Sequence, residues 1–138
     1  MGSPMPARAV NEANADNVRR VFSAFLGGAP RALFQVIAED AVWQVDGNVP
    51  VAQTYRGREE IFELFRATRR LTNGTYRSEL RWCLADDEHA VAVYRASGAR
   101  EGRTLDIDQV LLITLREGLW QEIVAVPTDP GAFEAFWA

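Results

Sequence analysis

Cysteine and histidine are almost absent from this sequence, which has Cys83 and His89 as its single examples of each. One cysteine cannot form an internal disulfide, and this usage is typical of a reducing compartment, so we expect a cytoplasmic protein. One histidine and one cysteine cannot supply a zinc-ligand set or a histidine-based catalytic triad. His89 follows three acidic residues in a predicted turn, where we expect it to be solvated. We therefore predict no metal.

Other patterns are missing as well. No apolar run approaches the roughly 18 residues of a membrane span, and no signal peptide is visible. There is no glycine-rich phosphate or dinucleotide loop, so we expect no cofactor. The net charge is -4, and the only adjacent basic pairs are Arg19-Arg20 and Arg69-Arg70. A nucleic-acid surface needs a concentrated basic face, so nucleic acid is not an expected partner, and neither is a membrane.

What the chain does have is length for one domain and a generous supply of aromatic residues. It contains 138 residues, 48% of them hydrophobic, with four Trp, seven Phe and three Tyr. Such rings fill cores and also line cavities for flat ligands. Met1-Gly2-Ser3-Pro4 before Met5 looks like the remnant of a purification tag, so we expect residues 1–10 to form a disordered tail. Residues 11–138 are expected to form a single domain.

Helical periodicity marks the first half of the chain. Val18, Val21 and Phe22 lie on one stripe of a helix predicted over residues 14–26, which Gly27-Gly28 would end. Further helices are predicted from Pro30, with Leu33, Phe34 and Ile37 inward, and over residues 58–71. Between them, residues 41–45 are rich in strand formers, and Asp46-Gly47 begins a turn.

The second half of the chain reads as consecutive strands joined by short turns. Strands are predicted over residues 75–84, 89–98, 103–115 and 119–126, followed by an aromatic tail that docks on the domain. Such strands form an antiparallel meander. We therefore predict an α+β fold, in which a cone-like, curved antiparallel sheet packs against three N-terminal helices and encloses a pocket. Hollows of this kind are the default ligand sites of a fold.

Four segments carry a resemblance to a known family. They are Ala38-Glu39-Asp40-Ala41-Val42-Trp43, Tyr55-Arg56-Gly57-Arg58-Glu59-Glu60, Arg100 to Asp106, and Ala132 to Trp137. The chain resembles the SnoaL-like proteins of the nuclear transport factor 2-like superfamily over about residues 15–138. That superfamily includes polyketide cyclases, ketosteroid isomerase, limonene-type epoxide hydrolases and pure binding domains, so the resemblance implies the fold more sharply than the reaction.

The sequence departs from many of these relatives at pocket positions. Gln44 stands where they often have His, and Asp46 where they often have Pro. Leu111 lies near a common His, and Val124-Ala125 replace a frequent Trp-Glu pair. The pocket is therefore expected to be more apolar than in those relatives, which favours a non-catalytic binding domain as the alternative to an enzyme.

Aspartates are the first candidates for chemistry. Asp106 and Asp108 alternate with apolar residues and so share one face of a strand. A carboxylate in an apolar pocket has a raised pKa and can act as a general acid or base. Resemblance to ketosteroid isomerase suggests Asp108 as a donor and Asp46 as a base. The alternative is that Asp106 and Asp108 face outward and pair with Arg95 or Arg103, while Asp46 only forms the turn.

Uncharged polar and aromatic residues complete the candidate site. Tyr55 and Tyr94 could donate hydrogen bonds to a carbonyl or enolate, with Tyr55 counted among the catalytic candidates. Trp43, Gln44 and Gln109 are candidate substrate contacts, together with Tyr94, Arg95 and Asp106. A set of Asp46, Arg95 and Asp108 around a water would instead suit epoxide opening. The structural alternative for Trp43 is a place in the core.

Taken together, the sequence favours a cofactor-independent cyclase or isomerase that uses carboxylate chemistry on an apolar, carbonyl-bearing small molecule such as a polyketide. The alternatives are a non-catalytic small-molecule-binding domain and an epoxide hydrolase or epoxide-opening cyclase. Val110 and Leu112 alternate with Leu111 and Ile113, which makes one strand apolar on both faces. One face can serve the core and the other a second copy, so we expect a homodimer.

Overall fold

The computed structural model describes residues 6–26 and 31–138. The tag-like segment at residues 1–4, the helix stop at residues 27–28 and the start at residue 30 lie outside these ranges. The elements are α1 (Ala7–Leu26), α2 (Arg31–Val36), β1 (Ile37–Val45), β2 (Thr54–Arg56), α3 (Gly57–Leu71), β3 (Arg77–Ala85), β4 (His89–Arg100), β5 (Arg103–Arg116), β6 (Leu119–Pro127) and α4 (Pro130–Trp137).

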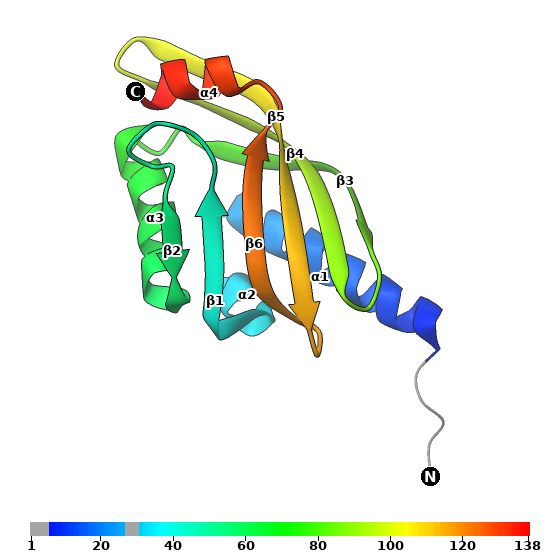
Figure 1. The fold of residues 1–138 in the computed structure, drawn as a ribbon. Coiled ribbons are helices and arrows are strands. Elements are labelled where there is room, and N and C mark those ends of the chain that lie inside the picture. The colour runs from blue at the N-terminus through cyan, green and yellow to red at the C-terminus, as the bar shows by residue number, and fades with distance from the viewer. Residues whose placement is uncertain (1–5, 27–30) are drawn as a thin grey trace.

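The six strands form one curved, open sheet in the order β2-β1-β6-β5-β4-β3. All neighbouring strands are antiparallel except β1 and β6, which run parallel. Helix α1 packs against β3, and α3 packs against β1. Helix α4 lies across the far end of β4 and β5 (Figure 1). The predicted α+β architecture is confirmed, with the one parallel pair as a refinement. Within the described ranges, no helix is long and apolar enough to cross a membrane.

Several element boundaries differ from those expected. Helix α1 begins at Ala7, so it is longer at its N-terminus than the helix predicted over residues 14–26. Ile37 was expected in the second helix but begins β1, where it is fully buried and lies opposite Trp120 of β6. The aromatic tail is a helix, because Asp129 caps its first turn by accepting a hydrogen bond from Ala132 N and Pro130 starts it.

The two faces of β5 have different environments. Odd-numbered residues from Leu105 to Leu115 are buried against the helices, while the even-numbered ones point to the opposite, outer face. Strand geometry requires this alternation. Because Leu111 and Ile113 are buried and Leu112 is 46% exposed, the strand is apolar on both faces, as its sequence indicates.

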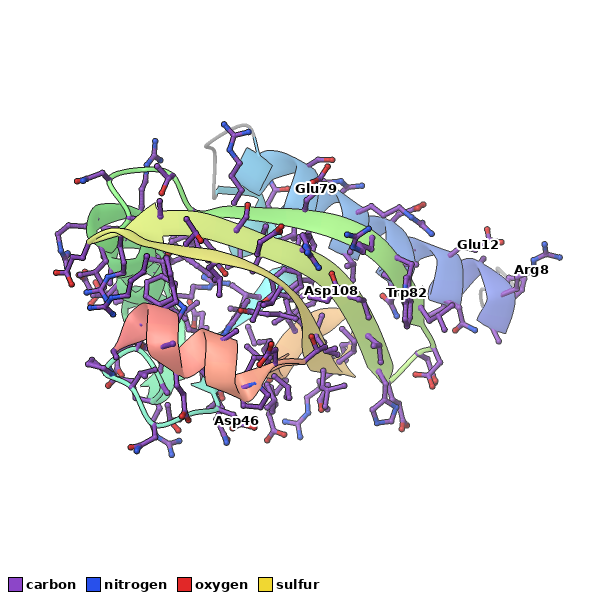
Figure 2. The ribbon with its side chains drawn as sticks, turned by 90° about the horizontal axis from the view of Figure 1, so that it is seen from above. Arg8, Glu12, Asp46, Glu79, Trp82 and Asp108 are labelled. Carbon is purple, nitrogen blue, oxygen red and sulfur yellow. The ribbon has the colours of Figure 1, made fainter. Side chains whose placement is uncertain are left out.

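An apolar area crosses the outer face of four strands. Two rows of directly opposed residues form it, and Trp82, Leu84 and Leu112 are 51%, 67% and 46% exposed. Figure 2 shows Trp82 on this face near Asp108. We call this area the outer patch; its residues are Trp82, Val93, Val110 and Val126 in one row and Leu84, Val91, Leu112 and Val124 in the other.

Candidate functional site

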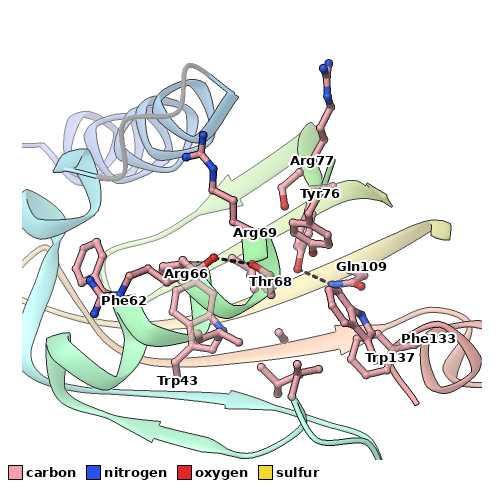
Figure 3. A pocket seen from close by; sticks show the side chains of 18 of the residues that line it. Trp43, Phe62, Arg66, Thr68, Arg69, Tyr76, Arg77, Gln109, Phe133 and Trp137 are labelled. Atoms are coloured by element: carbon pink, nitrogen blue, oxygen red, sulfur yellow. Dashed lines mark hydrogen bonds between the residues drawn. The ribbon is translucent and has the colours of Figure 1, made fainter. Parts of the chain in front are cut away.

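A cavity of about 410 Å³ lies between the inner face of the sheet, α3 and α4 (Figure 3). Its volume is in the range of small-molecule sites. The sheet contributes side chains from β1, β3, β4, β5 and β6, and residues of α1, α3 and α4 also line the cavity. Phe and Trp rings form a large share of its wall, namely those of Phe22, Trp43, Phe62, Phe65, Phe133 and Trp137.

The aromatic side chains pack edge to face around the cavity. The rings of Trp43 and Phe65 lie 5.2 Å apart at 89°, and those of Phe62 and Phe65 lie 6.1 Å apart at 79°. On the opposite wall, Tyr76 packs against Trp137 at 5.7 Å. Such contacts hold each ring in a defined orientation. The cavity therefore has walls suited to a flat, apolar molecule.

A polar cluster interrupts this wall. The amide Nε2 of Gln109 donates a hydrogen bond of 2.8 Å to the hydroxyl of Tyr94, and both residues are buried, at 4% and 5% exposure. The other amide atom, Gln109 Oε1, is buried without a hydrogen-bond partner. Tyr76 and Ser78 line the cavity beside this pair. In this cluster, buried hydrogen-bonding groups of Gln109 and Tyr94 therefore face the cavity.

Burial keeps the tyrosines of the cluster uncharged. It raises the pKa of Tyr94 well above its ordinary value, and the neighbouring Tyr76 raises it further. The pKa of Tyr76 is also raised, mainly by burial. Loss of solvation disfavours the phenolate. At neutral pH both side chains are therefore hydrogen-bond donors and not bases.

The turn between α3 and β3 fixes the position of Tyr76. The hydroxyl of buried Thr72 donates to Thr68 O at 2.8 Å and accepts from Tyr76 N at 3.1 Å. Gly98 of β4 approaches this segment so closely that an added Cβ would lie 3.3 Å from Tyr76 Cα. A side chain at position 98 would require the Tyr76 backbone to shift by a few tenths of an ångström, so glycine allows the close approach.

Helix α4 forms the end wall and is fastened at both ends. Gly47, with φ at +142°, leaves room for the ring of Phe133, which would lie 3.0 Å from an added Cβ. At the other end, the guanidinium groups of Arg100 and Arg103 donate hydrogen bonds of 3.1 Å each to Phe136 O. Cations at a helix C-terminus satisfy its free carbonyls. The wall carrying Phe133 and Trp137 is thus held against the sheet.

Charge is distributed unevenly around the cavity. Arg66, Arg69 and Arg77 stand at its rim, and Arg69 and Arg77 extend away from its aromatic centre in Figure 3. Among the described residues, no Asp, Glu, His or Cys lines the cavity, and none of these types gathers into a group able to hold a metal. The cavity can therefore donate hydrogen bonds but lacks a carboxylate base in its wall.

Three of the predicted site residues lie together in the cavity. Trp43, Tyr94 and Gln109 all line it, from three different strands. Tyr55 is buried behind the wall, where its hydroxyl donates to Val51 O at 2.9 Å and is thereby occupied. The Tyr55 hydroxyl proton is therefore not free for the hydrogen bond to a substrate that its predicted catalytic role requires.

The predicted acids lie elsewhere. Asp106 and Asp108 are on the outer face of β5, where Arg95 Nε lies 2.7 Å from Asp106 Oδ1 and Arg95 Nη1 lies 3.3 Å from Asp108 Oδ1. Strand alternation is the cause, because Leu105, Ile107 and Gln109 take the inner face. Asp106, Asp108 and Arg95 thus point away from this cavity, in the arrangement that the alternative of outward ion pairs describes.

Gln44 and Asp46 also point away from the cavity wall. Gln44 is exposed, and its Nε2 donates to Asp46 Oδ1 at 2.8 Å. The residue between them, Val45, faces the cavity instead. Asp46 is half-buried at the end of β1, beside the turn that packs on Phe133. The acid and amide predicted from this strand are therefore outside the observed cavity.

Several lining residues were not predicted. Tyr76, Ser78 and Thr68 supply polar atoms, and Phe133 and Trp137 come from the C-terminal helix. The aromatic pattern of that segment predicts that it packs on the domain, but it does not predict which surface it packs against. Tyr76 lies two residues after the Asn73-Gly74 pair, and only the folded structure brings it beside Gln109 of β5.

Comparison with known proteins gives the family. The family model described as SnoaL-like domain matches residues 18–123. Uncharacterized proteins of Mycobacterium tuberculosis and Mycobacterium bovis are 33% identical over 129 residues, which are 93% of this chain and 98% of each relative. The solved structure of Bal32a, from a soil-derived mobile gene cassette, has a TM-score of 0.89 and 28% identity, covering 94% of this chain and 99% of that one. A Jannaschia protein assigned to the SnoaL-like polyketide cyclases has a TM-score of 0.75 and 17% identity, covering 100% and 99%.

Proposed function

The chain belongs to the SnoaL-like domain family, and we propose that its cavity binds a flat, largely apolar small molecule carrying a polar oxygen, of the kind found in polyketides. The observation that carries this proposal is the buried Tyr94–Gln109 pair set in an aromatic wall. An apolar cavity with a few convergent polar groups is the usual form of a small-molecule site. The rings supply affinity, and the polar pair supplies orientation.

The composition of the wall favours binding over carboxylate catalysis. Among the described lining residues there is no Asp or Glu to remove a proton from carbon. Tyr94 and Tyr76 have raised pKa values, so both stay protonated at neutral pH and can donate hydrogen bonds but cannot act as bases. We therefore place the non-catalytic binding domain first.

A cyclase or isomerase is the second candidate. The phenol groups could stabilise the oxygen of a developing enolate, and the likeness to a protein assigned to the polyketide cyclases supports this candidate. The epoxide-opening alternative has less support. Arg95 and Asp108 form an ion pair on the outer face, while Asp46 bonds to Gln44 instead.

Titration with flavone, a flat apolar ketone, tests the binding proposal. Trp43 and Trp137 line the cavity, so binding should quench tryptophan fluorescence. At roughly -0.4 kcal/mol per heavy atom, we expect a Kd on the order of 10 µM. Ala125→Phe fills the cavity and should weaken binding at least about tenfold.

Ala99→Phe is the matched control, since Ala99 is exposed on β4 and is not a lining residue. Its affinity for flavone should stay within about twofold of the original chain. Absence of flavone binding, or equal binding by the Ala125→Phe variant, would contradict the proposal.

The aspartates provide a second test. Asp108→Asn should leave flavone affinity unchanged within about twofold, because Asp108 faces the outer surface. The free energy of unfolding should fall by less than about 1 kcal/mol, since the pair with Arg95 is partly exposed. Asp46→Asn should behave alike. A clear loss of flavone affinity in either folded variant would show that the carboxylate contributes to the site and would contradict its placement outside the cavity.

We further propose that the chain forms a homodimer through the outer patch. A continuous apolar area exposed across four strands marks an interaction surface. Beside it, Arg81 and Arg95 form ion pairs with Asp106 and Asp108, so both signs of charge border the patch. A surface with both signs can be complementary to a second copy across a two-fold axis. This supports a second copy as the occupant.

A further inference from the structure

Gln109 Oε1 is an acceptor without a hydrogen-bond partner among the described residues, while the Tyr76 hydroxyl also interacts with the Gln109 side chain. Gln109 Oε1 is buried on the inner face of β5, and its amide nitrogen is already bonded to Tyr94 at 2.8 Å. A buried acceptor without a partner destabilises the folded chain, because it has lost its hydrogen bond to water without gaining another. Since Gln109 lines the cavity, a partner can come from a molecule inside it.

The Tyr94 hydroxyl offers the complementary group. Its oxygen accepts the hydrogen bond from Gln109 Nε2, and no hydrogen bond donated by it is found within the described ranges. One donor and one acceptor therefore lie side by side on the cavity wall. The opposite orientation of the amide would exchange their places, leaving a free N–H and a free Tyr94 oxygen. Either orientation leaves one of each.

We propose that Gln109 and Tyr94 recognise a neutral hydroxyl group, a phenol or an enol, on the ligand. The hydroxyl accepts a hydrogen bond from one member of the pair and donates one to the other. This inference rests on the proposed function and names the chemical class of the molecule bound. Gln109 is then the residue that determines specificity at the polar end of the cavity.

Other ligand groups satisfy the pair less well. A carbonyl or ether oxygen accepts from Tyr94 but leaves Gln109 Oε1 unsatisfied. A phenolate has lost the proton that Gln109 requires and is poorly solvated among aromatic rings. An ammonium group would find no carboxylate among the described lining residues. A water molecule can fill both roles in an empty cavity, and a ligand hydroxyl reproduces them when it displaces that water.

Three probes of one ring system test this inference by calorimetry. Naphthalene offers no polar group, 2-methoxynaphthalene offers an acceptor, and 2-naphthol offers both an acceptor and a donor. We expect 2-naphthol to bind about tenfold more tightly than 2-methoxynaphthalene. In Gln109→Met, which keeps the volume and removes the amide, the ratio should fall below about twofold while naphthalene binds at least as well.

A measurement on the unaltered chain covers the case in which Gln109→Met fails to fold. Bound 2-naphthol, followed by its own absorbance, should ionise at a higher pH than free 2-naphthol, because the site requires the neutral hydroxyl. Ionisation at a lower pH when bound would overturn the inference.

The outcomes separate the two proposals. Equal binding of 2-naphthol and 2-methoxynaphthalene, with naphthalene also bound, would overturn hydroxyl recognition and leave the apolar binding cavity standing. Absence of binding by all three probes would overturn the proposed function, and hydroxyl recognition with it. A preference for 2-naphthol that persists in Gln109→Met would exclude Gln109 as its cause.

Discussion

Replacing Leu112 with arginine should convert a dimer of this chain into monomers. Leu112 lies in the outer patch between Val91 and Val124, and 46% of it is exposed in the single chain. In a two-fold dimer the substitution occurs twice and buries two charges against apolar surface. We expect the dimer dissociation constant to rise at least about 100-fold, equal to about 2.7 kcal/mol. Light scattering should change from twice the 15.4 kDa chain mass to once that mass.

Leu119→Arg is the matched control for this experiment. Leu119 is also an exposed leucine, at 39%, but it lies at the β5–β6 turn and not in the outer patch. This variant should remain dimeric. A monomeric mass for the unaltered chain at high concentration would contradict the dimer proposal, as would a dimer that tolerates Leu112→Arg.

Much of the fold was accessible from local patterns. The stripe of α3 and the turns before β4, β5 and β6 depend on neighbouring residues, so the sequence alone predicts them within a few positions. The parallel pairing of β1 with β6 was not accessible, because it joins Trp43 to Ile123 across most of the chain. The short strand β2 was missed for the same reason, since its pairing with β1 defines it.

The sequence alone does not determine which face of β5 is buried along the whole strand. The segment Leu105-Asp106-Ile107-Asp108 alternates and by itself indicates outward aspartates, as the structure has them. Further along, both faces are apolar, so hydrophobicity alone cannot say which one is buried. The resemblance to ketosteroid isomerase favoured an inward Asp108, while Gln109, an uncharged residue, takes the inner position.

Aromatic residues at the C-terminus were predicted to dock without a known target. The target is the open end of the sheet, where Phe133 meets Gly47 and Trp137 meets Tyr76. These contacts join residues more than 60 positions apart, and no local pattern encodes such distances. The cavity therefore depends on tertiary contacts that only the structure reveals.

Phe136→Ala should be the most destabilising single change in helix α4. The ring of Phe136 is 1% exposed and packs edge to face on Trp137, with centroids 4.7 Å apart. Removing a buried phenylalanine loses the transfer free energy of its ring and leaves a void, at a cost of about 3–5 kcal/mol. Chemical denaturation should show this loss in the free energy of unfolding. A domain of marginal stability would retain little structure after it.

Phe34→Ala is the control for Phe136→Ala, because it removes the same side chain from a more exposed position. Phe34 is 45% exposed and stacks on Phe62 at 3.9 Å, so its removal should cost only about 1 kcal/mol. Equal losses for Phe34→Ala and Phe136→Ala would contradict the placement of α4 as a packed wall. Because Phe133 and Trp137 flank Phe136 and line the cavity, the Phe136→Ala variant should also bind flavone more weakly under conditions in which it remains folded. A loss of both stability and flavone affinity would show that α4 contributes to the binding site. A loss of stability alone would assign α4 a purely structural role.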